Sequence, residues 1–122
     1  MNFTQATEYC RSMDAILAEP KTEEEHGVIH DYAKSLDTVI LIWLGATDSA
    51  SEGTWVWQSD DEPLTYDKWA DCCPRGDGRH CLVMSVPTGL FIDQLCSHSQ
   101  DSYDFLCQRK VQGNFLMTYI IL

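Results

Sequence analysis

Six cysteines constrain the fold more than any other feature of this chain of 122 residues. An even number of widely spaced cysteines in a small domain is typical of a disulfide framework, and such frameworks persist in oxidising compartments. Six cysteines allow fifteen pairings, and their spacing alone selects none of them. We therefore expect a secreted, extracellular domain cross-linked by some pairing of Cys10, Cys72, Cys73, Cys81, Cys96 and Cys107.

Length and charge bound the possible partners. A chain of this length, 44% hydrophobic, suits one domain with one core. Its net charge of -11 repels phosphate backbones, so nucleic acid is not an expected partner. The apolar segment 115–122 is too short to span a bilayer, so no membrane span is expected. Residues 1–5 have no signal-peptide pattern, and we expect the start of the chain to be truncated or incomplete.

The first third of the sequence has helical periodicity. Over residues 3–13 the residues at helical spacing, expected on one apolar face, are Phe3, Ala6, Cys10 and Met13. A capping box at Thr22 and Glu25 then predicts a second helix, in which Glu25 reaches back to the first turn. The apolar positions of this helix, which we expect to face the core, are Val28, Ile29, Tyr32, Ala33 and Leu36.

After residue 37 the pattern becomes that of β-strands. The continuous apolar run 39–45 predicts a strand buried on both faces. Shorter strands are predicted at 53–57, 81–86, 89–92 and 103–107. Two helices followed by strands indicate an α+β fold. The polar stretch 58–79 is too long for an idle connection, and loops of this length are usually functional.

The order of these segments resembles the C-type lectin-like domain over residues 3–109. The matching positions are Ala6, Cys10, Leu17-Ala18, Trp43-Leu44-Gly45-Ala46-Thr47-Asp48, Glu52-Gly53-Thr54-Trp55-Val56-Trp57, Trp69, Cys81, Asp93-Gln94-Leu95-Cys96 and Phe105-Leu106-Cys107. The resemblance implies two helices packed on two small antiparallel sheets, with a long irregular ligand loop and disulfide staples. It also implies the disulfides Cys10–Cys107 and Cys81–Cys96.

Cys72 and Cys73 are left unassigned by the resemblance. They would form a vicinal bridge, pair with another chain in a disulfide-linked dimer, or bind metal. Cys72, Cys73, His80 and Cys81 also read as a set of zinc ligands, although their spacing matches no strong pattern. The other histidines, His26, His30 and His98, show no partner pattern and are interpreted as surface residues.

The calcium ligands of sugar-binding relatives are almost wholly replaced. The resemblance places the ligand triplet at Cys73-Pro74-Arg75, the ligand glutamate at Arg79 and the ligand pair at Ile92-Asp93. Calcium requires six to eight oxygen ligands, and of these positions only Asp93 supplies one. We expect no metal at the usual site, while calcium elsewhere in the loop stays open. Pro74 is compatible with either a cis or a trans peptide bond.

The loop between Cys73 and Cys81 offers two binding chemistries. Arg75-Gly76-Asp77 matches the integrin-recognition tripeptide, which is a weak signal by itself. Exposed Arg75 and Arg79 are also suited to grip sulfate, phosphate or carboxylate groups on a glycan. The candidate ligand-binding loop is Cys73, Pro74, Arg75, Gly76, Asp77, Arg79 and His80, together with Asp93. Trp55 and Trp57 are interpreted as core residues rather than sugar-stacking platforms.

These features predict a binding module rather than an enzyme, because no nucleophile–base arrangement stands out. The first hypothesis is a secreted lectin-like protein that recognises carbohydrate or glycoprotein, with innate defence as its setting. The alternatives are a cell-adhesion module for integrin-type receptors and an acidic matrix protein. Residues 1–110 form the expected domain, apparently without the family's first strand. The apolar tail 111–122 is expected either to fold back as a replacement edge strand or to be disordered.

Overall fold

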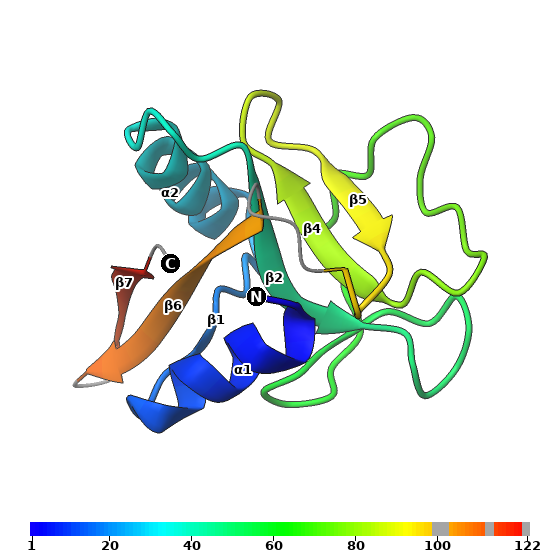
Figure 1. Cartoon of the computed structure of the whole chain (residues 1–122), viewed down its shortest axis with the longest axis horizontal. Helices are drawn as coiled ribbons and strands as arrows, with labels where there is room; N and C mark the ends of the chain where they lie inside the picture. The colour runs from blue at the N-terminus through cyan, green and yellow to red at the C-terminus, as the bar shows by residue number, and fades with distance from the viewer. Residues whose placement is uncertain (99–102, 112–113, 121–122) are drawn as a thin grey trace.

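The computed structural model describes residues 1–98, 103–111 and 114–120, with side chains up to Arg109. Two helices and seven strands follow one another in the chain. Their bounds are α1 Phe3–Ser12, β1 Ile16–Leu17, α2 Glu23–Lys34, β2 Leu41–Thr47, β3 Val56–Trp57, β4 Cys81–Ser85, β5 Phe91–Gln94, β6 Tyr103–Val111 and β7 Asn114–Ile120. The predicted α+β architecture with two helices is confirmed (Figure 1).

The strands form one mixed sheet in the order β1-β6-β2-β4-β5. Strand β2 runs parallel to β6 and antiparallel to β4, and it also pairs with β3. The expected two small sheets are therefore joined through β2 into a single connected network. Because β2 is central, its side chains are buried on both faces, as the continuous apolar run predicted.

Helix α1 packs against strands β1, β2 and β6 of this sheet. Asn2 caps this helix: its side-chain oxygen accepts a hydrogen bond from the Gln5 N–H, and the Gln5 side-chain oxygen accepts one from the Asn2 N–H. Its buried face includes Phe3, whose ring meets that of Trp43 edge-on at 5.8 Å. Cys10 on the same face forms a disulfide with Cys107 of β6, which ties the helix to the sheet.

Helix α2 begins as expected but buries a narrower face than expected. Thr22 accepts a hydrogen bond from the Glu25 N–H, whereas the Glu25 carboxylate accepts from the Lys21 N–H rather than closing the box at Thr22. Of the predicted core positions, Ile29 and Ala33 are buried, Leu36 is partly buried against the core, and Val28 and Tyr32 are exposed.

The interpretation of His26 as a surface residue was wrong. The side chain is only 8% exposed, and its two ring nitrogens lie 2.7 Å from the Tyr66 hydroxyl and 2.8 Å from the Gly89 carbonyl. These two polar partners allow an imidazole to occupy the buried face of α2. The helix is thereby connected both to the long loop, through Tyr66, and to the turn before β5.

Tryptophans fill the core on both sides of β2. Trp57 and Trp43 are almost completely buried, and Trp55 is 7% exposed. The interpretation of Trp55 and Trp57 as core residues is confirmed. Among the described residues, neither helix is long and apolar enough to cross a bilayer.

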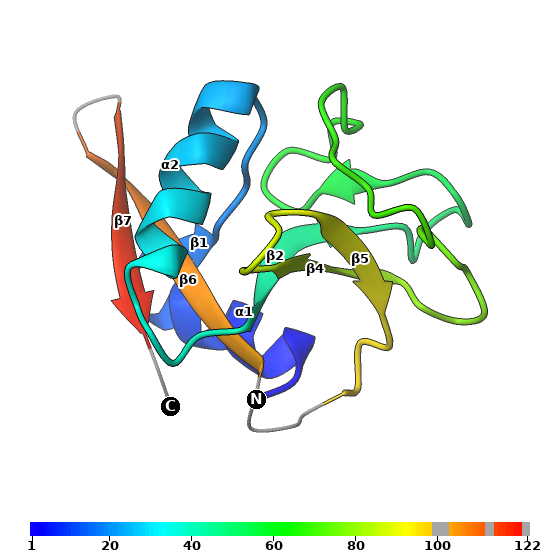
Figure 2. The same ribbon diagram turned by 90° about the horizontal axis from the view of Figure 1, so that it is seen from above.

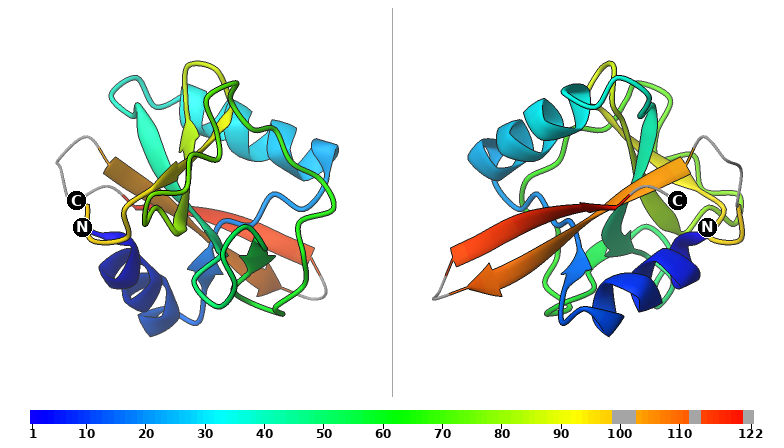
Figure 3. Two further views of the ribbon diagram at one scale, coloured as in Figure 1. Left: turned by 90° about the vertical axis from the view of Figure 1, so that its right-hand side faces the viewer. Right: turned by 60° about the vertical axis from the view of Figure 1, so that its left-hand side comes forward.

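The C-terminal segment forms a hairpin with β6. Strand β7 pairs antiparallel with β6 from Phe105 opposite Ile120 to Val111 opposite Asn114. Figure 3 shows the two strands as a ribbon that extends away from the rest of the sheet. The segment therefore pairs with β6 in the sheet.

Candidate functional site

The loops that carry the candidate site lie at the end of the molecule opposite the β6–β7 hairpin. Between β3 and β4 the chain runs through residues 58–80 without a long strand, and Figure 2 shows this stretch as the green loops beyond β4 and β5. Two backbone hydrogen bonds connect this stretch to β5. The Ala70 N–H donates to the Phe91 carbonyl at 2.9 Å, and the Phe91 N–H donates to the Lys68 carbonyl at 2.7 Å.

All six cysteines are paired. The structure contains the two disulfides that the resemblance implied, and Cys72 bonds to Cys73 as a vicinal bridge. The hypothesis that the cysteines of this loop bind zinc was therefore wrong, because none of them has a free thiolate to bind metal. A disulfide-linked dimer through Cys72 or Cys73 would require the vicinal bond to be opened. The following peptide bond, Cys73–Pro74, is cis.

Asp93 anchors the backbone of the tip of this loop, residues 75–77. It lies on β5 and is 1% exposed. Its Oδ2 atom accepts hydrogen bonds from the Arg75 N–H at 2.7 Å and from the Gly76 N–H at 2.8 Å. Its Oδ1 atom is also buried and has no hydrogen-bond partner in the described part of the chain. A carboxylate bonded to two consecutive backbone donors fixes the course of the loop at that point.

The tip itself projects into solvent. Arg75 is exposed, and the Asp77 side chain is 85% exposed. Gly76 and Asp77 both have left-handed backbone angles, with φ of 78° and 55°, a conformation that glycine and aspartate tolerate best. The Arg79 guanidinium lies 3.8 Å from the Asp77 carboxylate, which is a loose surface ion pair of little energetic weight.

The residues present do not fit the calcium ion of the family's sugar site. Arg75 and Arg79 carry positive charges, and Ile92 has no side-chain oxygen. The remaining candidate, Asp93, directs one oxygen to backbone N–H groups. Calcium requires a shell of six to eight oxygens, so these positions cannot supply it.

A second group of possible metal ligands was missed in the sequence. Asp48, Glu52 and His80 each present a ligand atom within 4.8 Å of the others. The Asp48 carboxylate is 1% exposed, lies 2.8 Å from His80 Nδ1 and accepts from the Gly53 N–H at 2.9 Å. The sequence placed His80 in the candidate loop, whereas Asp48 and Glu52 appeared only as positions that match the family. Asp48 and Glu52 precede β3 and His80 precedes β4, so nothing in the sequence brought the three together.

The two carboxyl groups of this cluster have shifted pKa values. Burial raises the pKa of Asp48, but the Gly53 N–H and the His80 side chain outweigh it and keep the pKa below its ordinary value. The hydrogen bond to Asp48 raises the pKa of Glu52, because two adjacent carboxyl groups favour sharing a proton. The cluster offers fewer oxygens than calcium requires, and an imidazole nitrogen is not a ligand that calcium prefers.

Of the residues predicted for the site, the structure brings one group together. Arg75, Gly76 and Asp93 are in direct contact, and His80 lies below the tip beside Asp48. The loop leads into β4, which pairs with β5, and the Cys81–Cys96 disulfide joins the first residue of β4 to the segment after β5. This pairing brings Asp93 close to the loop.

Comparisons with known proteins agree with this fold. Perlucin of Haliotis laevigata is 30% identical over 113 residues, which cover 89% of this chain and 70% of perlucin. Human tetranectin is 31% identical over 112 residues, which cover 87% of this chain and 54% of tetranectin. The carbohydrate-recognition domain of the human scavenger receptor C-type lectin superposes with a TM-score of 0.74 at 26% identity, covering 88% of this chain and 81% of that domain.

The sequence model of the lectin C-type domain matches residues 1–109. This match covers the cysteines, both helices and the loops just described. The chain therefore belongs to the lectin C-type domain family.

Proposed function

We propose that this chain is a secreted binding module that recognises a carbohydrate or glycoconjugate through the loop from Cys72 to His80, without calcium at the family's usual site. It acts by binding rather than by catalysis, and innate defence is a suitable setting. Membership of the lectin family supports carbohydrate as the ligand class. The similar domain of the human scavenger receptor is itself named a carbohydrate-recognition domain.

The observation that carries this proposal is the role of Asp93. Its carboxylate is bonded to the Arg75 and Gly76 N–H groups, so a protein contact replaces the contact that a metal ligand would make. These two hydrogen bonds restrain the backbone of the loop at Arg75 and Gly76, which supports binding without an ion. A loop that is already ordered loses less conformational entropy when a ligand binds.

The side chains that project from this loop indicate which groups of a glycan they would contact. Arg75 is exposed beside its anchored backbone, and Arg79 is partly exposed. A guanidinium donates two parallel hydrogen bonds to a planar anionic group, which makes arginine suited to carboxylates and sulfates. We therefore expect acidic or sulfated glycans to bind better than neutral ones, despite the negative charge of the whole chain.

A glycan array, probed with and without chelator, tests the proposal. The expected result is binding to acidic glycans that chelator leaves unchanged and that the double variant Arg75→Ala, Arg79→Ala loses. The matched control is Arg11→Ala with Lys34→Ala, which removes the same charge from the exposed ends of α1 and α2. Equal binding by both double variants would place the ligand site outside this loop.

Cell adhesion is the second candidate function. It is favoured by the exposure of Arg75-Gly76-Asp77 at a loop tip, with Asp77 85% exposed. Integrin-type receptors recognise the length of the aspartate side chain, so Asp77→Glu should abolish adhesion while leaving arginine-led glycan binding nearly unchanged. Adhesion of cells to the immobilised protein, inhibited by a soluble peptide of the same tripeptide, is the measurement. Adhesion that survives Asp77→Glu would contradict this candidate.

Three further proposals concern ions, partners and biological role. Calcium at a non-standard place would need backbone carbonyl or water oxygens in addition to the Asp48 and Glu52 carboxylates, and isothermal titration of wild type against Asp48→Asn tests for it. A disulfide-linked dimer through Cys72 or Cys73 would appear as a band of doubled mass in a non-reducing gel. A role as an acidic matrix protein rests on the net charge of -11 and predicts binding to a mineral surface that declines as salt is added.

A further inference from the structure

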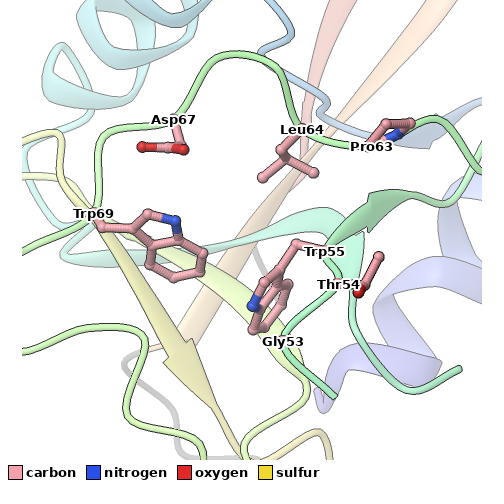
Figure 4. Close-up of a pocket in the computed structure, with 7 residues that line it drawn as sticks. All are labelled: Gly53, Thr54, Trp55, Pro63, Leu64, Asp67 and Trp69. Carbon is pink, nitrogen blue, oxygen red and sulfur yellow. The ribbon is translucent and has the colours of Figure 1, made fainter. Parts of the chain in front are cut away.

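A pocket lined by two tryptophans lies between the long loop and the segment before β3. Its volume is about 290 Å³, enough for one small group. In Figure 4 the indole of Trp69 and the carboxylate of Asp67 lie on one side, with Leu64 and Pro63 on the other and the indole of Trp55 beside Trp69. The lining residues are Gly53, Thr54, Trp55, Pro63, Leu64, Asp67 and Trp69.

The walls of this pocket are fixed by the fold. The indoles of Trp55 and Trp69 meet edge-on with ring centroids 5.2 Å apart, and Trp55 is 7% exposed. The Leu64 N–H donates to the Trp55 carbonyl at 3.2 Å, which joins the two sides. Trp69 is held against β5 by a bridge to Phe91. A ligand would therefore enter a site that is already formed, as is usual for small-molecule pockets.

The charge of the lining is one-sided. Asp67 is exposed and negative, and none of the described residues that line the pocket is positive. Lys68, the chain neighbour of Asp67, carries a positive charge but is not among the residues that line the pocket. Indole rings attract cations through their negative faces. A carboxylate beside two indoles is therefore complementary to a positive charge.

We infer that this pocket binds an organic ammonium group, such as that of a free amino sugar or a quaternary amine. Its apolar substituents would pack on the half-buried Trp69 indole and on the small part of Trp55 that lines the pocket, while its charge pairs with Asp67. An anionic ligand would be repelled by Asp67, and an apolar ligand would remove water from that carboxylate without replacing its hydrogen bonds. The site uses no residue of the loop from Cys72 to His80, and it is independent of the proposed function.

The test is an NMR titration that follows the indole N–H signals of the four tryptophans. The probes are tetramethylammonium chloride, glucosamine and N-acetylglucosamine, each compared with sodium chloride at equal ionic strength. The expected result is saturable shifts at Trp55 and Trp69 with the first two probes, and none at the buried Trp43. N-acetylglucosamine should bind far more weakly, because acetylation removes the charge.

Variants separate this site from the loop. Asp67→Asn should weaken tetramethylammonium binding by about fivefold, as loss of about 1 kcal/mol from an exposed ion pair implies. Asp37→Asn, an exposed acid beyond the end of α2, removes the same charge and should leave binding unchanged, and the double variant Arg75→Ala, Arg79→Ala should do likewise. Equal binding of glucosamine and N-acetylglucosamine, or tetramethylammonium shifts that Asp67→Asn leaves unaltered, would overturn the inference.

Discussion

Replacing Asp93 with alanine would remove the anchor of the ligand loop. The carboxylate is 1% exposed and accepts two backbone hydrogen bonds, at 2.7 and 2.8 Å. A hydrogen bond to a charged group contributes about 1.5–3 kcal/mol, and the two bonds share one acceptor atom, so their sum is an upper limit. We expect Asp93→Ala to lower the free energy of unfolding by about 2–4 kcal/mol. Urea denaturation followed by tryptophan fluorescence measures this value.

Asp93→Asn is the matched control for that experiment. The amide keeps one oxygen, which can accept from the Arg75 and Gly76 N–H groups without the negative charge. It places its NH₂ group where Oδ1 now has no partner. We expect it to destabilise the protein by about 1–2 kcal/mol, because neutral hydrogen bonds contribute roughly half as much. Unchanged stability in Asp93→Ala, within about 0.5 kcal/mol, would refute the reasoning that this carboxylate holds the loop.

Three further predictions concern the scaffold. Trp43→Ala should cost about 3–5 kcal/mol in urea denaturation, because it empties a fully buried site; a cost below about 1 kcal/mol would contradict this. Burial lowers the pKa of His26 below its ordinary 6.5, so the unfolded state takes up protons first and wild-type stability should fall as the pH drops below 6.5. That fall should be smaller in His26→Phe, and an equal fall in both proteins would count against it. Truncation after Lys110 removes β7, the edge partner of β6, and should lower the melting temperature by at least about 4 °C, whereas no change would show that the hairpin adds no stability.

Hydrophobic periodicity predicted where the two helices lie, but it predicted their buried side chains only in part. Spacing identified both helices and, for α1, the buried positions Phe3, Ala6 and Cys10, while Met13 at the end of the helix is only partly buried. For α2 the same rule also included Val28 and Tyr32, which are exposed, and omitted His26, which is buried. Periodicity records which residues are apolar, whereas the width of the buried face depends on how the sheet and loops cover the helix. A polar side chain with two partners can occupy that face, and those partners lie 40 and 63 residues away.

The candidate site was partly predictable for a similar reason. Comparison of ligand positions identified Asp93 as the one surviving acid, but its contact with the Arg75 and Gly76 N–H groups depends on the loop conformation. The cluster of Asp48, Glu52 and His80 was missed because its members come from two segments that meet only in the folded chain. The pairing of Cys72 with Cys73 was one of three open alternatives, since adjacent cysteines give no spacing to choose between them.

Affinity for a glycan, measured in millimolar calcium and again in excess chelator, tests most directly whether the loop binds without an ion at the usual site. The ligand is the best binder from the array, and the measurement is isothermal titration with the wild-type chain. We expect the same dissociation constant, within about twofold, in both conditions, because Asp93 accepts hydrogen bonds from the Arg75 and Gly76 N–H groups and the neighbouring positions carry no calcium ligands. Loss of binding in chelator, restored by calcium and abolished in Asp93→Ala, would contradict it.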